Sequence, residues 1–147
     1  MKFLILNGPN LNLLGKREPE IYGDRSYAEL CETVRRHAEK IGVCVDFLQS
    51  NHEGTLIDAL QNADGAYDGV VFNPAGYSHT SVALFDAVKA IAVPVAEVHL
   101  SDPDLREPFR QTDLIAPACV GCIKGKGFDG YCQATDLLKA RIVLEGS

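Results

Sequence analysis

The sequence contains no run of apolar residues long enough to cross a bilayer. A transmembrane helix needs about 20 apolar residues in succession, whereas the apolar runs here have the length of strands. At the N-terminus, Lys2 precedes only four consecutive apolar residues, which is too few for a signal peptide. We therefore expect residues 3–6 to form a first strand, and we expect no membrane partner.

Positive charge is also scarce. The formal net charge is −6, whereas a surface that binds nucleic acid is normally basic. The composition therefore argues against a nucleic-acid partner. Four cations nevertheless fall beside the candidate site described below, so a small anionic ligand fits this acidic chain. They are Lys16, Arg17, Arg106 and Arg110.

The cysteines form an odd set of five without a secretory signal, and a reducing cytoplasm is the expected location. Cys119 and Cys122 have C-x-x-C spacing. Thioredoxin-like chemistry requires that pair before a helix that follows a strand, but here it lies inside an apolar run. We interpret the two cysteines as buried strand thiols, with a redox or metal role as the lesser alternative.

Several cofactor and catalytic motifs are absent. Ser78 and Ser81 lie in no G-x-S-x-G, which excludes a hydrolase nucleophile elbow. No G-x-G-x-x-G follows the first strand, as a Rossmann dehydrogenase requires. Asn7 and Asn73 stand where a receiver domain needs acidic residues, and residues 8–15 offer no hydroxyl to an FMN phosphate. The remaining alternative without catalysis is that the chain is a structural homologue of an enzyme but is itself inactive.

What the sequence does contain is a regular alternation of apolar runs and helical periodicity. Near-continuous Val/Ile/Leu strands that alternate with helices indicate a parallel sheet covered on both faces. We expect one flavodoxin-like domain over residues 1–147, an α/β three-layer sandwich with five parallel strands in the order 2-1-3-4-5. Strands are expected at 3–6, 43–47, 69–72, 93–98 and within 118–123. Helices are expected near 26–41, 56–63, 80–91 and 128–143, with a short helical turn at 102–110 and a lid at 8–25.

Polar residues gather directly after three of these strands, and parallel sheets bind ligands beyond the carboxyl ends of their strands. The first cluster holds Asn10, Arg17 and Tyr22. Lowering the pKa of a phenol by about three units requires roughly 4 kcal/mol, which a neighbouring arginine in a closed site could supply. The alternative is that the Tyr22 ring packs and Arg17 pairs with a nearby glutamate.

The second cluster, at residues 73–79, combines turn-forming residues with Asn73 and His79. His79 precedes a helix whose N-terminal dipole disfavours an imidazolium. A neutral His79 that hydrogen-bonds a ligand hydroxyl suits this setting. A histidine that only caps the helix is an equally good interpretation.

The third cluster follows the fourth strand. Glu97 and His99 alternate with Val98, so their side chains point to the same face. A carboxylate beside an imidazole raises the pKa of the histidine, which is how a general acid stays protonated. The backbone N–H groups of Leu100 and Ser101 then begin a helical turn and could bind a carboxylate. Arg106 and Arg110 would share one face of that turn, unless Arg106 only pairs with Glu107 or Asp113.

Several separated motifs resemble those of type II 3-dehydroquinate dehydratases. They occur in the family's order and span nearly the whole chain. They are GPNLNLLGKREP at 8–19 followed by Tyr22 and Gly23, QSNHEG at 49–54, NPAGYSHTSVA at 73–83, and EVHLS at 97–101 with Arg106, Phe109 and Arg110.

The resemblance implies reversible dehydration of 3-dehydroquinate through an enolate, without metal or organic cofactor, in a homododecamer built as a tetramer of trimers. It also assigns roles. Tyr22, helped by Arg17, is the expected base, Asn10 stabilises the enolate, and His99 supported by Glu97 is the acid. The expected substrate-binding residues are Asn73, His79, Asp86, Leu100, Ser101 and Arg110, of which Asp86 reaches a neighbouring subunit.

Two positions depart from the family's usual pattern. Ala75-Gly76 reverses the common Gly-Ala order, which we expect to shift the loop slightly. Phe85 stands where arginine is frequent, which would alter one contact between subunits.

Overall fold

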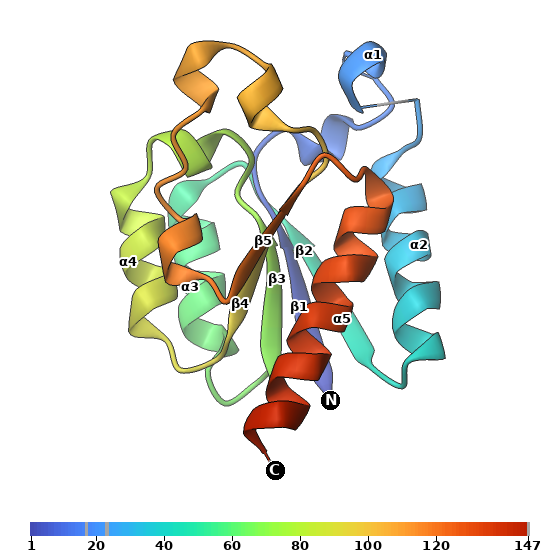
Figure 1. The fold of residues 1–147 in the computed structure, drawn as a ribbon, viewed down its shortest axis with the longest axis vertical. Coiled ribbons are helices and arrows are strands. Elements are labelled where there is room, and N and C mark those ends of the chain that lie inside the picture. The colour runs from blue at the N-terminus through green and yellow to red at the C-terminus, as the bar shows by residue number, and fades with distance from the viewer. Residues whose placement is uncertain (17, 23, 147) are drawn as a thin grey trace.

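The computed structural model describes residues 1–16, 18–22 and 24–146, with the side chain of Tyr22 left out. Its centre is one parallel sheet of five strands in the order β2-β1-β3-β4-β5, as predicted. All five strands run in the same direction, so their carboxyl ends form a single edge (Figure 1). The strands are β1 Lys2–Asn7, β2 Cys44–Gln49, β3 Gly69–Asn73, β4 Val95–His99 and β5 Gly121–Lys124.

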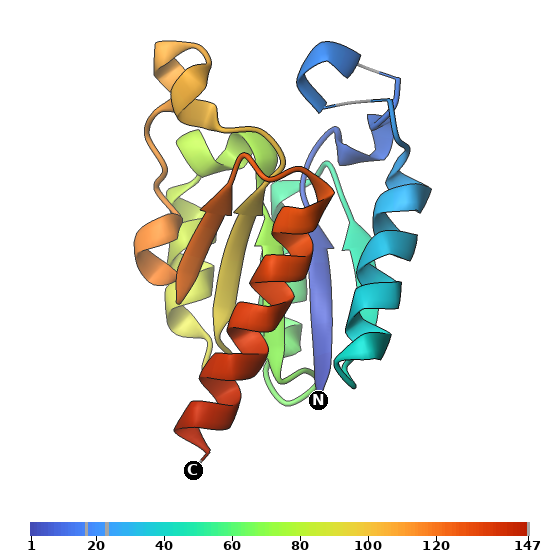
Figure 2. The same ribbon diagram turned by 45° about the vertical axis from the view of Figure 1, so that its right-hand side comes forward.

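Helices cover both faces of the sheet and complete the three layers of a flavodoxin-like fold. α2 and α5 pack on one face, and α3 and α4 pack on the other (Figures 1 and 2). Both termini lie at the edge opposite the strands' carboxyl ends. The α-helices are α1 Pro19–Tyr22, α2 Tyr27–Lys40, α3 Glu53–Ala63, α4 Val82–Ala90 and α5 Phe128–Glu145.

Two hydrophobic clusters form the core, one on each face of the sheet. β1 shows how the sequence builds them, because successive side chains of a strand point to opposite faces. Phe3 and Ile5 belong to the cluster beneath α2 and α5, whereas Leu4 and Leu6 belong to the cluster beneath α3 and α4. All four are buried. A strand buried on both faces has no polar side, as its continuous apolar run predicts.

Helix α2 begins as its sequence predicts, with one difference. The Oγ of Ser26 accepts a hydrogen bond from the backbone N–H of Glu29 at 3.2 Å. The Glu29 carboxylate, which a full capping box would turn back to Ser26, instead accepts from Nε of Arg25 at 3.4 Å. Gly42 follows the helix with φ +74°, a left-handed conformation that glycine adopts without strain.

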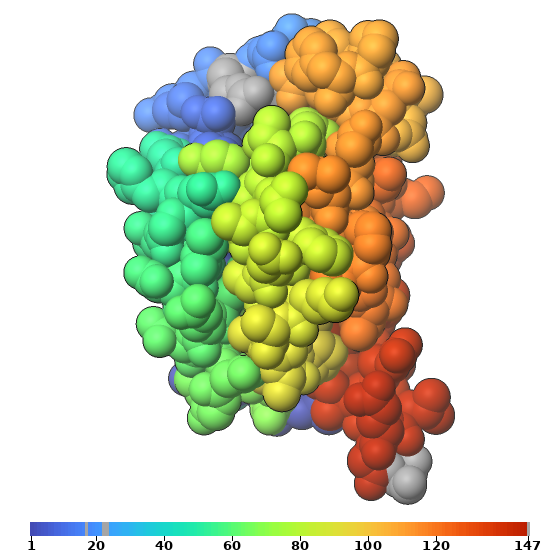
Figure 3. All heavy atoms as spheres, turned by 90° about the vertical axis from the view of Figure 1, so that its left-hand side faces the viewer, coloured from blue at the N-terminus to red at the C-terminus, as the bar shows by residue number. Residues whose placement is uncertain are grey.

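Five short 3₁₀ turns connect the described elements, and most of them lie at the strands' carboxyl edge. Figure 3 shows α3 and α4 side by side with the η3 and η4 region above them. The turns are η1 Leu11–Leu13, η2 Ala75–His79, η3 Pro103–Leu105, η4 Pro108–Arg110 and η5 Ala116–Ala118. The predicted helical turn at 102–110 is therefore two separate turns.

Other predictions are corrected in detail. Residues 8–25 are not a lid throughout, because Leu11 and Leu14 are buried in the core beneath α2 and α5. β5 begins inside the predicted range 118–123, at Gly121, and ends one residue beyond it, at Lys124, while residues 116–118 form η5. Within the described ranges, no helix combines the length and the apolar character that a membrane span demands.

Candidate active site

A cavity opens at the carboxyl edge of the sheet, where the sequence predicts a ligand site. It encloses about 190 Å³, below the range of about 300–1,000 Å³ that is typical for drug-sized ligands, so a compact ligand fits best. Seven of the predicted site residues line it. They are Asn10, Asn73, His79, His99, Leu100, Ser101 and Arg110.

The loop after β1 forms one wall of the cavity and is tied to the loop after β3. The backbone N–H of Gly8 donates to the carbonyl of Asn73 at 2.8 Å. A Cβ at Gly8 would lie 2.7 Å from the Pro74 carbonyl oxygen, so only glycine allows this approach. Asn10 follows in the left-handed region, with φ 70°, and its N–H donates to Oδ1 of Asn51 at 3.0 Å. These contacts fix the backbone from which Asn10 reaches the cavity.

Asn73, at the end of β3, is almost fully buried and held on both sides of its amide group. Its Oδ1 accepts from the backbone N–H of Ala75 at 3.0 Å, and its Nδ2 donates to the Tyr131 hydroxyl at 2.9 Å. Tyr131 in turn donates to Oδ1 of Asn7 at 2.6 Å. An amide nitrogen carries two protons, so the second N–H of Asn73 can serve a ligand. Tyr131 is a residue that sequence reasoning placed only in the core.

His79 lies at the end of η2, and its ring is oriented by the backbone. Nδ1 is 2.7 Å from the carbonyl oxygen of Thr112. A carbonyl can only accept, so Nδ1 carries the proton, and in the neutral ring Nε2 is an acceptor. The interpretation of His79 as a helix cap is wrong, because Ser81 caps α4 by accepting from the Leu84 N–H at 3.0 Å. His79 is therefore available to a ligand.

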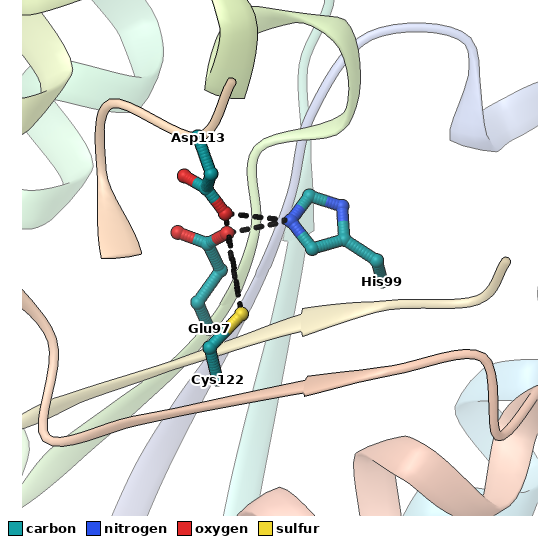
Figure 4. Close-up of side chains that lie close together, drawn as sticks. All are labelled: Glu97, His99, Asp113 and Cys122. Carbon is teal, nitrogen blue, oxygen red and sulfur yellow. Dashed lines mark hydrogen bonds and ion pairs between the residues drawn. The ribbon is translucent and has the colours of Figure 1, made fainter. Parts of the chain in front are cut away.

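Glu97 and His99 meet at the end of β4, as their spacing predicts. Nε2 of His99 lies 2.5 Å from Oε2 of Glu97, and neither side chain is more than 7% exposed. The other ring nitrogen points away from the carboxyl group (Figure 4). Because His99 lines the cavity, Nδ1 is the ring atom that can exchange a proton with a ligand.

Sequence reasoning missed the second carboxyl group beside His99. Oδ2 of Asp113, which lies in the loop between η4 and η5, is 3.5 Å from Nε2 of His99 (Figure 4). Cys122 on β5 completes the group, with Sγ 3.6 Å from Oε2 of Glu97. No local pattern marks Asp113 as a partner of His99, because a loop without periodicity brings it back over β4.

The environment formed by the neighbouring carboxyl groups keeps His99 protonated at neutral pH. Burial alone would lower the pKa of the imidazole, but hydrogen bonds to Asp113 and Glu97 overcome that effect and raise the pKa to about 9. With Arg106 and Arg110 also lining the cavity, the site favours an anionic ligand and can donate a proton to it.

The two arginines lie on different turns rather than on one helical face. Arg106 follows η3 and lies 3.9 Å from Oε2 of Glu107 and 3.8 Å from Oε2 of Glu18. Arg110 ends η4, and its Nε donates to Glu107 at 2.7 Å. The predicted pair of Arg106 with Glu107 is thus present, yet both guanidinium groups still line the cavity.

Leu100 and Ser101 lie between β4 and η3 and do not begin a helical turn. That turn starts at Pro103, with Asp102 as its N-cap. The prediction that a turn begins at Leu100 is wrong, because Pro103 supplies the first helical position and its fixed φ sets the start. Both residues nevertheless line the cavity.

Two predicted residues that the structure describes do not line the cavity, namely Asp86 and Glu97, of which Glu97 contacts His99. Asp86 is exposed on α4 and does not line the cavity of its own chain. Arg17 lies outside the described residues, and so does the side chain of Tyr22, the last residue of α1.

Glu97, His99, Asp113 and Cys122 are also the residues with which a metal ion could be held, since their ligand atoms lie within 4.8 Å of one another. The His99–Glu97 distance of 2.5 Å argues against this use. Two ligands on a tetrahedral zinc, each about 2.1 Å from the ion, would lie roughly 3.4 Å apart. The spacing is that of a hydrogen bond.

The sequence is similar to those of known enzymes. The 3-dehydroquinate dehydratase 1 of Corynebacterium efficiens is 54% identical over 137 residues, which cover 93% of this chain and 91% of that protein. The 3-dehydroquinate dehydratase of Bacillus licheniformis is 56% identical over 128 residues, covering 87% of this chain and 88% of that protein.

Solved structures of related proteins are also similar to this chain. The type II dehydroquinase from Butyrivibrio crossotus superposes with a TM-score of 0.92 at 42% identity, covering 95% of this chain and 97% of that one. That from Propionibacterium acnes gives 0.89 at 34% identity, covering 94% and 96%. The sequence profile described as "Dehydroquinase class II" matches residues 1–139. The chain belongs to the class II dehydroquinase family.

Proposed function

We propose that this chain is a hydro-lyase that removes water reversibly from 3-dehydroquinate to give 3-dehydroshikimate through an enolate. The observation that carries this proposal is His99, a buried imidazole that lines an arginine-containing cavity and has two carboxyl groups beside its Nε2. Such a group can give a proton to a departing hydroxyl. The family to which the chain belongs supports the same reaction.

The remaining roles follow the chemistry that the elimination needs. Tyr22, made more acidic by Arg17, is the base that removes the proton next to the ketone. Asn10 stabilises the negative charge that then develops on the enolate oxygen. Nδ1 of His99 protonates the leaving hydroxyl, with Glu97 orienting the ring.

The substrate is held by groups that surround these three. Asn73, His79 and Arg110 bind its hydroxyls, and the backbone N–H groups of Leu100 and Ser101 bind its carboxylate. No step requires a metal or an organic cofactor. We propose a cytoplasmic homododecamer, a tetramer of trimers in which Asp86 reaches a neighbouring site, that serves aromatic biosynthesis or quinate breakdown.

The direct test is ultraviolet detection of the conjugated enone product from 3-dehydroquinate, with and without a chelator. We expect turnover in both conditions.

Replacing Tyr22 by Phe should abolish turnover while preserving ligand binding, because the ring remains and only the base is lost. A Tyr22→Phe variant with near-normal turnover would remove Tyr22 from its role.

A second variant separates the two proton transfers. We expect His99→Ala to lose dehydration, because no acid is left for the hydroxyl, while slow exchange of the α-proton into solvent survives. Exchange into deuterated water is followed by NMR. Unchanged dehydration by His99→Ala would refute the assignment of the acid.

A further inference from the structure

His99 contacts two carboxyl groups, and their surroundings differ in a way that decides which one is charged. Glu97 comes from β4, beside His99 on the same strand, whereas Asp113 comes from the loop before η5. Figure 4 shows both groups directed at the same ring nitrogen, Nε2. One imidazolium needs only one anion, so the second carboxyl group can keep its proton.

Asp113 is built to carry a negative charge. Its Oδ1 accepts two backbone hydrogen bonds, from the N–H groups of Ile115 and Ala116, each at 3.0 Å. Its Oδ2 faces Nε2 of His99, and its side chain is 14% exposed, so water reaches it. Backbone donors and partial solvation stabilise the ionised form of a carboxyl group.

Glu97 has the opposite environment. Its side chain is completely buried, and among the described residues its Oε1 has no hydrogen-bond partner. Ionisation of a carboxyl group is strongly disfavoured when one of its oxygens has neither water nor a hydrogen-bond donor beside it. The thiol of Cys122, 3.6 Å from Oε2, is at best a weak donor. In a neutral carboxylic acid, by contrast, the unpaired oxygen carries far less charge.

We propose that Asp113, and not Glu97, supplies the negative charge that keeps His99 an imidazolium, while Glu97 is a neutral carboxylic acid that positions the ring. In this arrangement the Oε2 hydroxyl of Glu97 donates to Asp113, and the same oxygen accepts from Nε2–H of His99 at 2.5 Å. Oε1 then needs no partner. The proposal rests on the role of His99 as the acid, and it makes Asp113 a positioning residue for the reaction.

The proton affinities of the three groups agree with this assignment. Burial raises the pKa of Glu97; the hydrogen bond to His99 acts against this and the hydrogen bond to Asp113 adds to it, with the result that the pKa is about 7. Burial also acts to raise the pKa of Asp113, but hydrogen bonds from His99, Glu97 and the Ala116 N–H outweigh it and hold that pKa below its usual value. The pKa values of the two carboxyl groups thus lie far apart. In such a pair one group keeps its proton and the other is an anion.

Other groups around His99 do not change the assignment. Burial raises the pKa of the Cys122 thiol to about 12, so it remains uncharged at neutral pH. Arg106, Arg110 and His79 line the same cavity as His99. Positive charge close to an imidazole disfavours its protonated form, so an anion beside His99 is needed.

Two isosteric variants separate the carboxyl groups. Asp113→Asn keeps an Oδ1 acceptor for the Ile115 and Ala116 N–H groups but removes the charge. Glu97→Gln imitates a neutral acid. The measurement is the titration of the His99 ring in the free enzyme, by NMR of protein with ¹⁵N-labelled histidine. The chain has four histidines, and a His99→Gln spectrum assigns the signal.

We expect Asp113→Asn to lower the pKa of His99 by roughly 1–3 units, the effect of removing one adjacent opposite charge, and Glu97→Gln to lower it by clearly less. A larger shift in Glu97→Gln than in Asp113→Asn would overturn the proposal. Infrared spectroscopy gives a second reading. At pH 6 the wild type should show a carboxylic-acid carbonyl band that Glu97→Gln lacks, and its absence from the wild type would also overturn the proposal.

These readings do not depend on turnover. If the wild-type protein is inactive but shows the expected titrations, the proposed reaction is refuted and the charge assignment still holds. In active enzyme, the alkaline limb of the kcat/KM profile should move to lower pH in Asp113→Asn, because that limb reports the loss of the proton from His99. An unmoved limb would contradict the proposal.

Discussion

At the scale of single residues, the cavity is lined by side chains that hydrogen bonds within the protein hold in place. Asn73 is fixed by Tyr131 on one side and by the Ala75 N–H on the other. His79 is fixed by the Thr112 carbonyl. Both residues line the cavity, and each keeps some hydrogen-bonding capacity for a ligand, the second N–H of Asn73 and the Nε2 of His79. The ligand therefore meets groups whose orientation is set before it binds.

Ala75 is a residue that the fold holds against its own preference. Its φ is 52°, in the left-handed region that costs an L-residue about 1–2 kcal/mol. The reversed Ala-Gly order thus places the side chain where a glycine would be relaxed.

We predict that Ala75→Gly raises the free energy of unfolding by up to about 1 kcal/mol, since relief of strain is partly offset by the greater freedom of glycine in the unfolded chain. Urea denaturation measures the change. Gly76→Ala is the control, because a Cβ there meets nothing within 4 Å and its φ is not left-handed; it should be neutral or slightly stabilising. A less stable Ala75→Gly variant would contradict this account.

At the scale of elements, the strand ends bring the site together, and the loops decide its details. The alternation of strands and helices predicts the sheet order and the edge at which the cavity opens, because parallel strands buried on both faces leave a distinct apolar pattern. Asn73 and His99 follow from that pattern, since each ends a strand, and so does Glu97, which lies on β4 two residues before His99.

The loops could not be predicted in the same way. Asp113 reaches His99 through a chain segment with no periodic signal, and its partners Ile115 and Ala116 lie beside it in sequence without marking where it points. The division of residues 102–110 into η3 and η4 depends on Pro103 and Pro108, each of which begins a new turn. Loop geometry of this kind is set by tertiary contacts rather than by local propensity.

The contact between the β1 and β3 loops gives a test at this scale. We predict that Gly8→Ala lowers the free energy of unfolding by about 1–3 kcal/mol and weakens ligand binding. A Cβ at this position would lie 2.7 Å from the Pro74 oxygen and 2.9 Å from its carbonyl carbon, and a backbone group cannot easily move away.

Calorimetry and ligand titration measure the two effects of Gly8→Ala. Gly54→Ala in α3 is the matched control, because nothing lies within 4 Å of its Cβ and alanine favours the helix. Equal behaviour of the two variants would show that the two loops are not in close contact.

At the scale of the whole molecule, the buried charges make stability depend on pH. The raised pKa of His99 stabilises the fold fully below about pH 6.5, and this contribution is lost as the pH rises through about 9. The raised pKa of Glu97 likewise contributes below about pH 4.5 and is lost as the pH rises through about 7. The lowered pKa of Asp113 contributes above its usual value of 3.8 and is lost in stronger acid.

We therefore predict that Glu97→Gln flattens the decline in unfolding free energy between about pH 4.5 and 7, since glutamine cannot ionise. Urea denaturation of the wild type and the variant across pH 4 to 9.5 measures the difference. The decline between about pH 6.5 and 9, due to His99, should remain in the variant. Parallel curves for the two proteins below pH 7 would count against a raised pKa for Glu97.

Assembly is the other property of the whole molecule. Asp86 is exposed on α4 and away from the cavity of its own chain, as a residue that serves a neighbouring subunit would be. We predict a dodecamer of 15.9 kDa chains by light scattering and a reduced kcat/KM for Asp86→Ala in an assembly of unchanged size. Lys89→Ala, one turn further along α4, is the control. A stable monomer with full activity would contradict the role of Asp86.

The orientation of His79 carries a consequence for selectivity. Since the Thr112 carbonyl occupies the Nδ1–H of His79, an uncharged ring would offer only the Nε2 lone pair to whatever enters the cavity. A compound with an alcohol at that point satisfies the lone pair, whereas the matching ketone or ether would set two acceptors against each other. Enzymes that hydrogen-bond a substrate alcohol can reject analogues lacking it by about 10⁴-fold. We therefore predict that the backbone of a loop 33 residues away in sequence helps determine the oxidation level of the compounds that this cavity accepts.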